Sequence, residues 1–117
     1  MTHAEFRALC LAQPGSHEEP HFDRASFRAN KKIFATLRPD HDEAMVKIPE
    51  AERVGELLMQ SGESGPFFSY GGWTTNGGAV GVRLSRVDDG VIEELVALAW
   101  GGVVAKKRRT PSRAKPG

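Results

Sequence analysis

The feature that most constrains the fold is a pair of short strand-like segments, 26–29 and 32–37, separated only by Asn30-Lys31. Asn tolerates the positive φ that a tight hairpin turn requires, so the sequence predicts two antiparallel strands joined at this point. Alternation along the second strand predicts one face made of Ile33, Ala35 and Leu37, and an opposite face made of Lys32, Phe34 and Thr36.

Helical patterns lie on both sides of this hairpin. Thr2-His3-Ala4-Glu5 has the spacing of a capping box and begins a helix that Pro14-Gly15 ends. A second helix is predicted after Pro49, with Gly62 as its C-terminal stop. Asp88 or Asp89 caps a third helix with a broad apolar face, which Gly101-Gly102 weakens. These helices supply the apolar surface that can cover one face of a sheet.

The remaining segments complete an α+β chain. We expect a polar connection over 17–24 in which Phe22 is the buried side chain, a strand over 44–48, an aromatic strand over 66–70, a loop or hairpin tip over 71–78, and a strand over 79–84. The predicted fold is therefore α+β, with helices packed on one face of a small, mainly antiparallel sheet.

Charge divides the chain into two parts. Of the 16 basic residues, the last twelve positions hold Lys106, Lys107, Arg108, Arg109, Arg113 and Lys115, with no acid among them. The preceding part keeps 10 basic against 15 acidic residues, so the overall net charge of +1 describes neither part. We expect one domain over 1–105 and a basic tail over 106–117, whose composition cannot bury a core and predicts disorder.

Residue types that carry chemistry occur without the arrangement that catalysis or metal binding needs. Cys10 is the sole cysteine and lies at an apolar position of the first helix, which predicts a buried thiol and excludes an internal disulfide. His17-Glu18-Glu19-Pro20-His21 has the letters of a zinc-protease motif, but Pro20 argues against the helix on which that motif depends. The glycines of 71–78 lack the Gly-Lys-Ser/Thr ending of a phosphate-binding loop. The sequence predicts no enzyme, no metal and no cofactor.

Hydrophobic segments and cysteine content predict where in the cell the protein is located. No run of about 18 apolar residues is present, which predicts no membrane partner. Glu5 and Arg7 interrupt the N-terminal segment, so it lacks the apolar core of a secretory signal. A single cysteine fits a reducing compartment, and we expect a cytoplasmic protein.

Basic residues of the strands suggest a binding surface. If the helices cover one sheet face, the opposite face becomes relatively basic, with Phe34, Tyr70 or Trp73 interleaved, which is a nucleic-acid-like pattern. An ordinary solvated sheet face explains the same pattern, and a solubilising terminus explains the tail. The candidate nucleic-acid-binding residues are Arg28, Lys31, Lys32, Arg38, Lys47, Trp73, Arg83 and Arg86, together with Lys106, Lys107, Arg108 and Arg109 of the tail.

A family resemblance covers nearly the whole predicted domain. The motifs that carry it, in order, are Pro14-Gly15, Glu19 with His21-Phe22, Phe27-Arg28, Lys32-Ile33-Phe34-Ala35-Thr36-Leu37, Val46-Lys47-Ile48, Gly72-Trp73-Thr74, Val82-Arg83-Leu84, and Leu95 with Ala99-Trp100. Together they resemble the MmcQ/YjbR-like family. The resemblance implies a compact α+β fold and a DNA-binding-like character, and it supplies no catalytic residues. The chain departs from the pattern at 75–79, which look like an insertion, and at Val104-Ala105-Lys106, where a proline is absent.

Two functions of different class remain open from the sequence. The first is a non-enzymatic binding module whose ligand is double-stranded DNA, bound through the basic sheet face and the tail. The second is a protein-interaction or adaptor domain that uses the sheet face, with no role in nucleic-acid binding.

Overall fold

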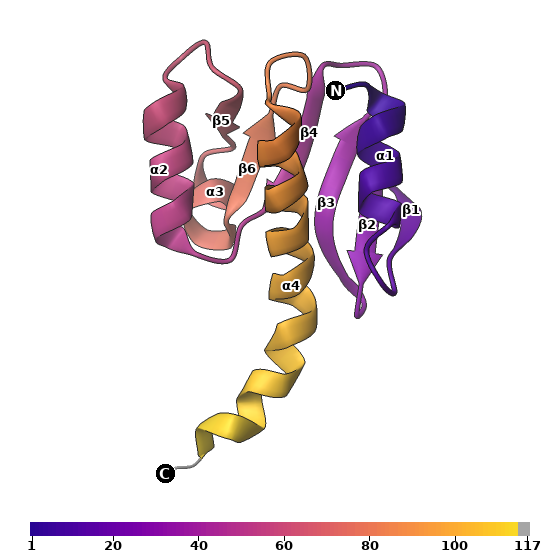
Figure 1. Cartoon of the computed structure of the whole chain (residues 1–117), viewed down its shortest axis with the longest axis vertical. Coiled ribbons are helices and arrows are strands. Elements are labelled where there is room, and N and C mark those ends of the chain that lie inside the picture. The colour runs from indigo at the N-terminus through magenta and orange to yellow at the C-terminus, as the bar shows by residue number, and fades with distance from the viewer. Residues whose placement is uncertain (115–117) are drawn as a thin grey trace.

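The computed structural model describes residues 1–114, with side chains through Ala105, as an α+β fold. Within these residues it forms four helices and one six-stranded sheet (Figure 1). The elements in chain order are α1 (His3–Leu11), β1 (His17–His21), β2 (Arg24–Ala29), β3 (Lys32–Arg38), β4 (Glu43–Lys47), α2 (Ala51–Ser61), β5 (Phe67–Ser69), α3 (Gly72–Gly77), β6 (Ala79–Val82) and α4 (Asp89–Ala114).

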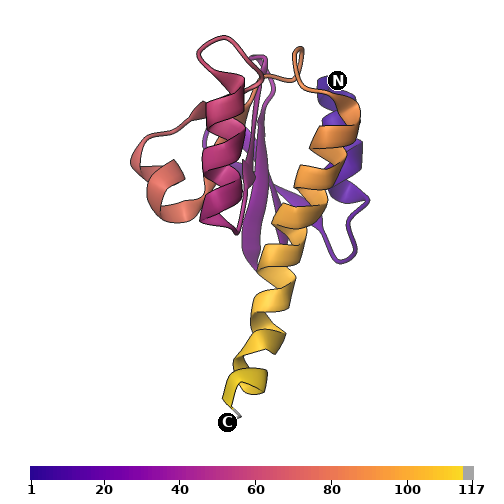
Figure 2. The same cartoon turned by 60° about the vertical axis from the view of Figure 1, so that its left-hand side comes forward.

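The sheet is antiparallel at every pairing, in the order β1-β2-β3-β4-β6-β5. Helices α1, α2 and α4 contribute to one hydrophobic core against it, and Phe6, Leu57 and Leu95 are among their buried side chains. Figure 2, in which the sheet is seen nearly edge-on, shows α4 on one side and the short α3 on the other. The predicted fold class is confirmed, and the side of the sheet that carries α3 is called the open face below.

The predicted hairpin is confirmed, but the predicted alternation along β3 is wrong. Asn30 and Lys31 both have positive φ, at 53° and 65°, as a tight hairpin turn requires. Phe27 pairs with Ala35 and Arg28 pairs with Ile33, so Phe34 is an extra residue, as in a β-bulge. The bulge places Phe34 in the core, fully buried, instead of on the open face.

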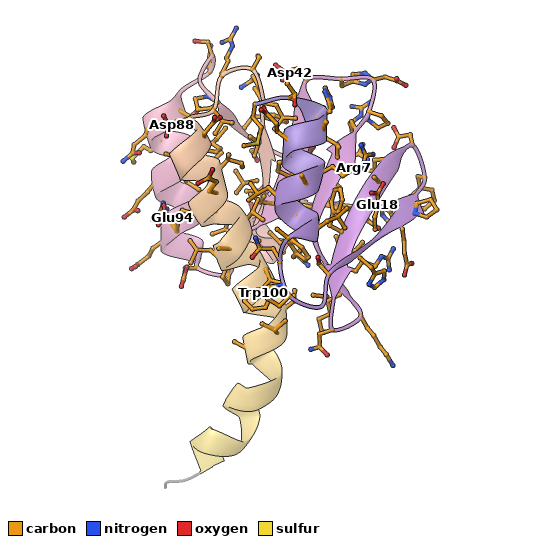
Figure 3. All side chains as sticks on the ribbon, turned by 45° about the vertical axis from the view of Figure 1, so that its right-hand side comes forward. Arg7, Glu18, Asp42, Asp88, Glu94 and Trp100 are labelled. Atoms are coloured by element: carbon orange, nitrogen blue, oxygen red, sulfur yellow. The ribbon has the colours of Figure 1, made fainter. Side chains whose placement is uncertain are left out.

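The segment after α1 was predicted as a connection and is instead an edge strand. β1 pairs with β2 from His17↔Arg28 to His21↔Arg24, and Pro20 is tolerated because the outer edge of the sheet needs no N–H donor. Its side chains are mostly exposed on both faces, so the strand has no apolar period in the sequence. Figure 3 shows Glu18 of β1 beside Arg7 of α1, and their ion pair at 3.0 Å ties this strand to the helical layer.

Helix ends follow the sequence signals closely. The capping box of α1 is present, with the Thr2 hydroxyl accepting from the Glu5 N–H and the Glu5 carboxylate accepting from the Thr2 N–H. Asp88 accepts from the Val91 N–H at the start of α4. Gly62 ends α2 with a φ of 66°. These contacts confirm the predicted starts of α1 and α4 and the predicted stop of α2.

The course of the chain differs from prediction at two further places. The segment 71–78 contains the helical turn α3, whereas a loop or hairpin tip was expected. The backbone of α4 continues through Gly101-Gly102, where a weakened end was predicted, and its bounds run to Ala114. The disorder expected from Lys106 stays a prediction. Ala, Lys and Arg at 105–109 are good helix formers, which favours this continuation. Residues 115–117, and the side chains beyond Ala105, lie outside the described part.

Candidate functional site

The strand register determines which side chains reach the open face. His17, Glu19 and His21 of β1 are opposite Arg28, Ser26 and Arg24 of β2, and Thr36 of β3 is opposite Met45 of β4. Phe68 of β5 is opposite Gly81, where any Cβ would clash with the Phe68 ring. The open face therefore carries charged residues toward β1 and β2, and aromatic residues toward β5.

The arginines on this face are held by acids. Arg38 contacts Glu43 at 3.1 Å and Asp23 at 3.7 Å, and Arg24 contacts Asp23 at 3.1 Å. The hydrogen bond from Arg24, together with the charge of Arg38, lowers the pKa of Asp23. The hydroxyl of Tyr70 donates to Glu43, and burial followed by this bond raises the pKa of Tyr70. Arg38 belongs to this network and is not available as a free cation.

Arg28 is neutralised in the same way. Its guanidinium lies 3.6 Å from Glu19 and donates to the Ser26 hydroxyl at 3.0 Å. His17 contacts the other oxygen of Glu19 at 2.7 Å. The hydrogen bond with His17, aided by the charge of Arg28, lowers the pKa of Glu19. Glu19 therefore stays ionised at neutral pH and keeps Arg28 paired.

Lysines gather at the end of the sheet where the β2–β3 hairpin meets α4. A cleft of about 1110 Å³ lies there, and its basic lining residues are Arg28, Lys31, Lys32 and Lys47. Glu50 is the one acid among its lining residues. No ion pair within 4.0 Å involves Lys31, Lys32 or Lys47 among the described residues. We call this the lysine cleft.

The walls of the lysine cleft are fixed by specific contacts. The side-chain amide of Asn30 donates to the Val103 carbonyl at 3.1 Å, which holds the hairpin tip against α4. On the other side, a Cβ at Gly102 would lie 3.2 Å from the Pro49 ring, so glycine permits α4 to approach the start of α2. These contacts set the positions of the hairpin tip and of the start of α2 relative to α4.

Helix α4 leaves the domain beside this cleft. Ala105 lines the cleft, and Lys106 follows it directly in the chain. Figure 1 shows the hairpin tip and the projecting part of α4 at the same end of the molecule. The predicted tail residues Lys106, Lys107, Arg108 and Arg109 therefore begin next to the lysine cleft, although their side chains lie outside the described part.

A second cleft, of about 920 Å³, lies across the middle of the open face. Ile33, Thr36 and Met45 line it from the sheet, and the β1–β2 turn and α3 bound it on two sides. Phe22 of that turn is 94% exposed and Trp73 of α3 is 77% exposed. Tyr70 also lines the cleft. We call this the aromatic cleft, and it shares Ile33, Lys47 and Gly77 with the lysine cleft.

Helix α3 is anchored so that Trp73 faces solvent. Thr74 is buried, and its hydroxyl donates to the Ala79 carbonyl and accepts from the Tyr70 N–H. Gly78 ends the helix with a φ of 75°, at a point where a Cβ would clash with the Ile48 carbonyl. The neighbouring Trp73 is thereby turned outward, because the buried side of this short helix is taken by Thr74.

The predicted site residues separate into groups. Lys31, Lys32, Lys47 and Arg28 come together in the lysine cleft, and Trp73 borders the aromatic cleft. Arg83 donates to the Gly65 carbonyl at 2.7 Å and stacks over the Phe68 ring at 4.7 Å. Arg86 donates to the Ser64 carbonyl. These last two arginines fix the loop before β5 and line neither cleft.

Sequence reasoning misplaced the other exposed aromatic residue of the site. Phe22 was predicted to be buried, and that prediction is wrong. It occupies the first position of the two-residue β1–β2 turn with a φ of 60°. The sequence signal for this turn is the dipeptide Phe22-Asp23 between two polar segments. The dipeptide indicates a turn only when the segment before it, β1, is recognised as a strand.

The single thiol of the chain lies in neither cleft. Cys10 is fully buried, and this burial raises the pKa of its thiol. Among the described residues no three His, Cys, Asp or Glu side chains are placed to hold a metal ion. Within the same residues no helix is both long and apolar enough to cross a membrane. In the part of the chain that the structure describes, the two clefts present lysines without an ion pair beside exposed aromatic rings.

Comparison with protein-family models identifies a family. Residues 11–101 match the family model described as YjbR, which is most of the chain. The match begins at the end of α1 and ends within α4, so it includes all six strands and the whole lining of the aromatic cleft. Of the lysine-cleft lining it leaves out only Gly102, Val103 and Ala105. A search of curated proteins found no match.

Proposed function

The chain belongs to the YjbR family, and we propose that it is a non-enzymatic nucleic-acid-binding module, with double-stranded DNA as its ligand. One observation carries this proposal. Lys31, Lys32 and Lys47, which form no ion pair among the described residues, share a cleft that ends where the basic tail begins. The basic segment 106–117 follows Ala105 of this cleft directly in the chain, which supports a joint role for the two basic regions.

Paired and unpaired charges contribute differently to such a surface. A nucleic-acid phosphate gains little from an arginine that already holds a carboxylate, because the existing ion pair must be broken first. A solvated lysine needs only to release its water, and binding also frees the counterions condensed on the nucleic acid. The lysine cleft and tail are therefore the favoured phosphate contacts, while Arg38, Arg83 and Arg86 serve the fold.

The net negative charge of residues 1–105 does not oppose this role. Many acids lie on the helices of the covered face, and Glu52, Glu56, Glu93 and Glu94 belong to α2 and α4. Interactions between exposed charges fall off over a Debye length of about 8 Å at physiological salt, so the local lysines dominate at their own cleft. The lone buried thiol supports a cytoplasmic location within the same proposal.

The adaptor alternative draws on the aromatic cleft. Two exposed aromatic rings beside an apolar floor would also suit a peptide side chain. Pull-down from lysate with and without nuclease separates the two functions. Partners lost after nuclease support the nucleic-acid proposal, and a protein retained after nuclease supports the adaptor.

A titration with duplex DNA tests the proposal directly. The full chain and a chain lacking 106–117 are each titrated with a labelled 20-base-pair duplex from 50 to 200 mM salt, using fluorescence anisotropy. We expect binding that weakens steeply with salt in the full chain, and a shallower dependence without the tail. No binding at 50 mM salt in either protein would overturn the proposal.

A further inference from the structure

The position of Phe22 is explained neither by packing nor by backbone preference. At 94% exposure its ring contributes almost nothing to the core, although its edge contacts the His21 ring with centroids 4.8 Å apart. A φ of 60° at the first residue of a two-residue hairpin turn is a place where glycine is favoured. A large exposed ring in a conformation that costs free energy points to a role outside the fold.

Trp73 faces the same cleft from the opposite side. Its helix α3 and the β1–β2 turn are far apart in sequence, yet both border the floor of Ile33, Thr36 and Met45. Thr36 and Asn76 add hydrogen-bonding groups to the lining, and Tyr70 is held by Glu43. Aromatic rings above an apolar floor with a few polar groups are suited to a flat aromatic ligand such as a nucleobase.

The lysine cleft continues into this aromatic cleft. Ile33, Lys47 and Gly77 line both, so Lys47 belongs to the aromatic cleft as well as to the lysine cleft. A chain of phosphates lying along Lys31, Lys32 and Lys47 would therefore bring its bases to the aromatic cleft. Paired and stacked bases of a duplex cannot enter such a cleft, whereas unstacked bases of a single strand can.

We propose that the aromatic cleft binds one or more unstacked bases of single-stranded nucleic acid, with Phe22 and Trp73 as stacking groups. The inference rests on the proposed function, because it takes the lysine cleft as the phosphate-binding region. It adds unpaired segments of nucleic acid, beside the duplex, as a second form of ligand. It also assigns a binding role to Phe22, which neither charge nor the family match indicates.

Two variants test the stacking groups in the full chain. Phe22→Gly removes one ring and relieves the backbone, and Trp73→Ala removes the other. Met59→Ala is the matched control, because Met59 is 82% exposed on α2 and lines neither cleft. Each protein is titrated with labelled oligothymidylate and with a duplex of equal length at 100 mM salt. Protein fluorescence is also followed, and comparison with Trp73→Ala separates quenching of Trp73 from the signal of Trp100.

We expect each cleft variant to bind oligothymidylate at least about fivefold more weakly, which is the lower end for loss of one base–aromatic stack. Duplex affinity should stay unchanged, and Met59→Ala should behave as the unaltered protein does. Because Phe22→Gly is expected to be more stable, unfolding cannot explain its loss of binding.

The outcomes separate this inference from the proposed function. If duplex and single strand both bind and neither cleft variant changes the single-strand affinity, the inference is overturned and the proposed function stands. If neither nucleic acid binds, the proposed function fails and the inference fails with it. In the pull-down, a partner protein can stay bound to the unaltered chain after nuclease treatment and yet fail to bind the Phe22→Gly variant. That result would show that the aromatic cleft holds a peptide, which also overturns the inference.

Discussion

The arginines of the open face and the lysines at its hairpin end carry the same formal charge in different surroundings. Arg28 and Arg38 each lie within 4.0 Å of an acid. Lys31, Lys32 and Lys47 form no ion pair among the described residues and line a cleft beside the exit of α4. The difference shows that formal charge alone does not identify a phosphate-binding surface, because only cations without an acidic partner are available to a phosphate.

Removing the lysines gives the largest expected effect. The variant Lys31→Gln/Lys32→Gln/Lys47→Gln should bind duplex DNA several-hundred-fold more weakly at 0.1 M salt, because each lost phosphate contact costs roughly eightfold there. Anisotropy titration measures the loss. The thermal midpoint should change little, since these side chains form no ion pair among the described residues. A loss below about tenfold would show that the lysine cleft is not the phosphate-binding region.

Removing a paired arginine should affect stability instead of binding. Arg38→Gln leaves the mostly buried Glu43 without its cation, and we expect a loss of about 1–2 kcal/mol in the free energy of unfolding. Duplex affinity should change by less than about twofold, because Arg38 offers no free charge to lose. Urea denaturation and anisotropy on the same sample give both values. A large loss of duplex affinity with unchanged stability would show that the paired arginines contact phosphate as the lysines do.

Converting a paired arginine into a free one should strengthen binding. Glu19→Gln releases Arg28, which already lines the lysine cleft, and a new phosphate contact would tighten duplex binding by up to roughly eightfold at 0.1 M salt. Glu18→Gln is the control, because it changes the charge equally but acts on Arg7 of α1. Equal gains in both variants would mean that net charge alone matters.

The same pair has a defined pH dependence. Because the pKa of Glu19 is lowered in the folded protein, the stability that it contributes is fully present above its unfolded pKa, near 4.5. That contribution is lost as the pH falls through the lower folded value. The effect of Glu19→Gln on DNA binding should therefore be the same at pH 7 and pH 8, where Glu19 is ionised. Anisotropy titrations at both values check this.

The smallest expected effect concerns the exposed aromatic group. Phe22→Gly should raise the free energy of unfolding by about 1 kcal/mol, since glycine adopts a positive φ without the steric cost that a Cβ imposes. Urea denaturation measures the change. A loss of stability would show that the Phe22 ring contributes to the fold, and it would weaken the argument that this position is kept for binding.

Local signals in the sequence predicted much of the fold. The capping box at Thr2 and Glu5, the Asn30-Lys31 turn and the stop at Gly62 each depend on neighbouring residues alone, so their positions were predictable. β1 was missed because an exposed edge strand needs no apolar period. Phe34 was assigned to the wrong face because a bulge depends on pairing between strands, which one strand's alternation does not reveal.

The candidate site was predictable in its residues but not in their grouping. The lysines, Trp73 and the arginines were all selected from the sequence as basic or aromatic residues. Which of them are free depends on partners such as Glu19 and Asp23, which lie on β1 and its turn. The aromatic cleft has Phe22 and Trp73 on its border although they are far apart in the sequence, and no local sequence pattern indicates this arrangement.

The salt dependence of duplex binding tests the central claim most directly, because its slope reports the number of phosphate contacts. Log affinity is plotted against log salt concentration for the unaltered chain, for the triple lysine variant and for Arg38→Gln. We predict that the triple variant lowers the slope by about 2.7, or about 0.9 for each phosphate contact, and that Arg38→Gln leaves it unchanged. Equal slopes for all three proteins would contradict the claim that the unpaired lysines hold the phosphates.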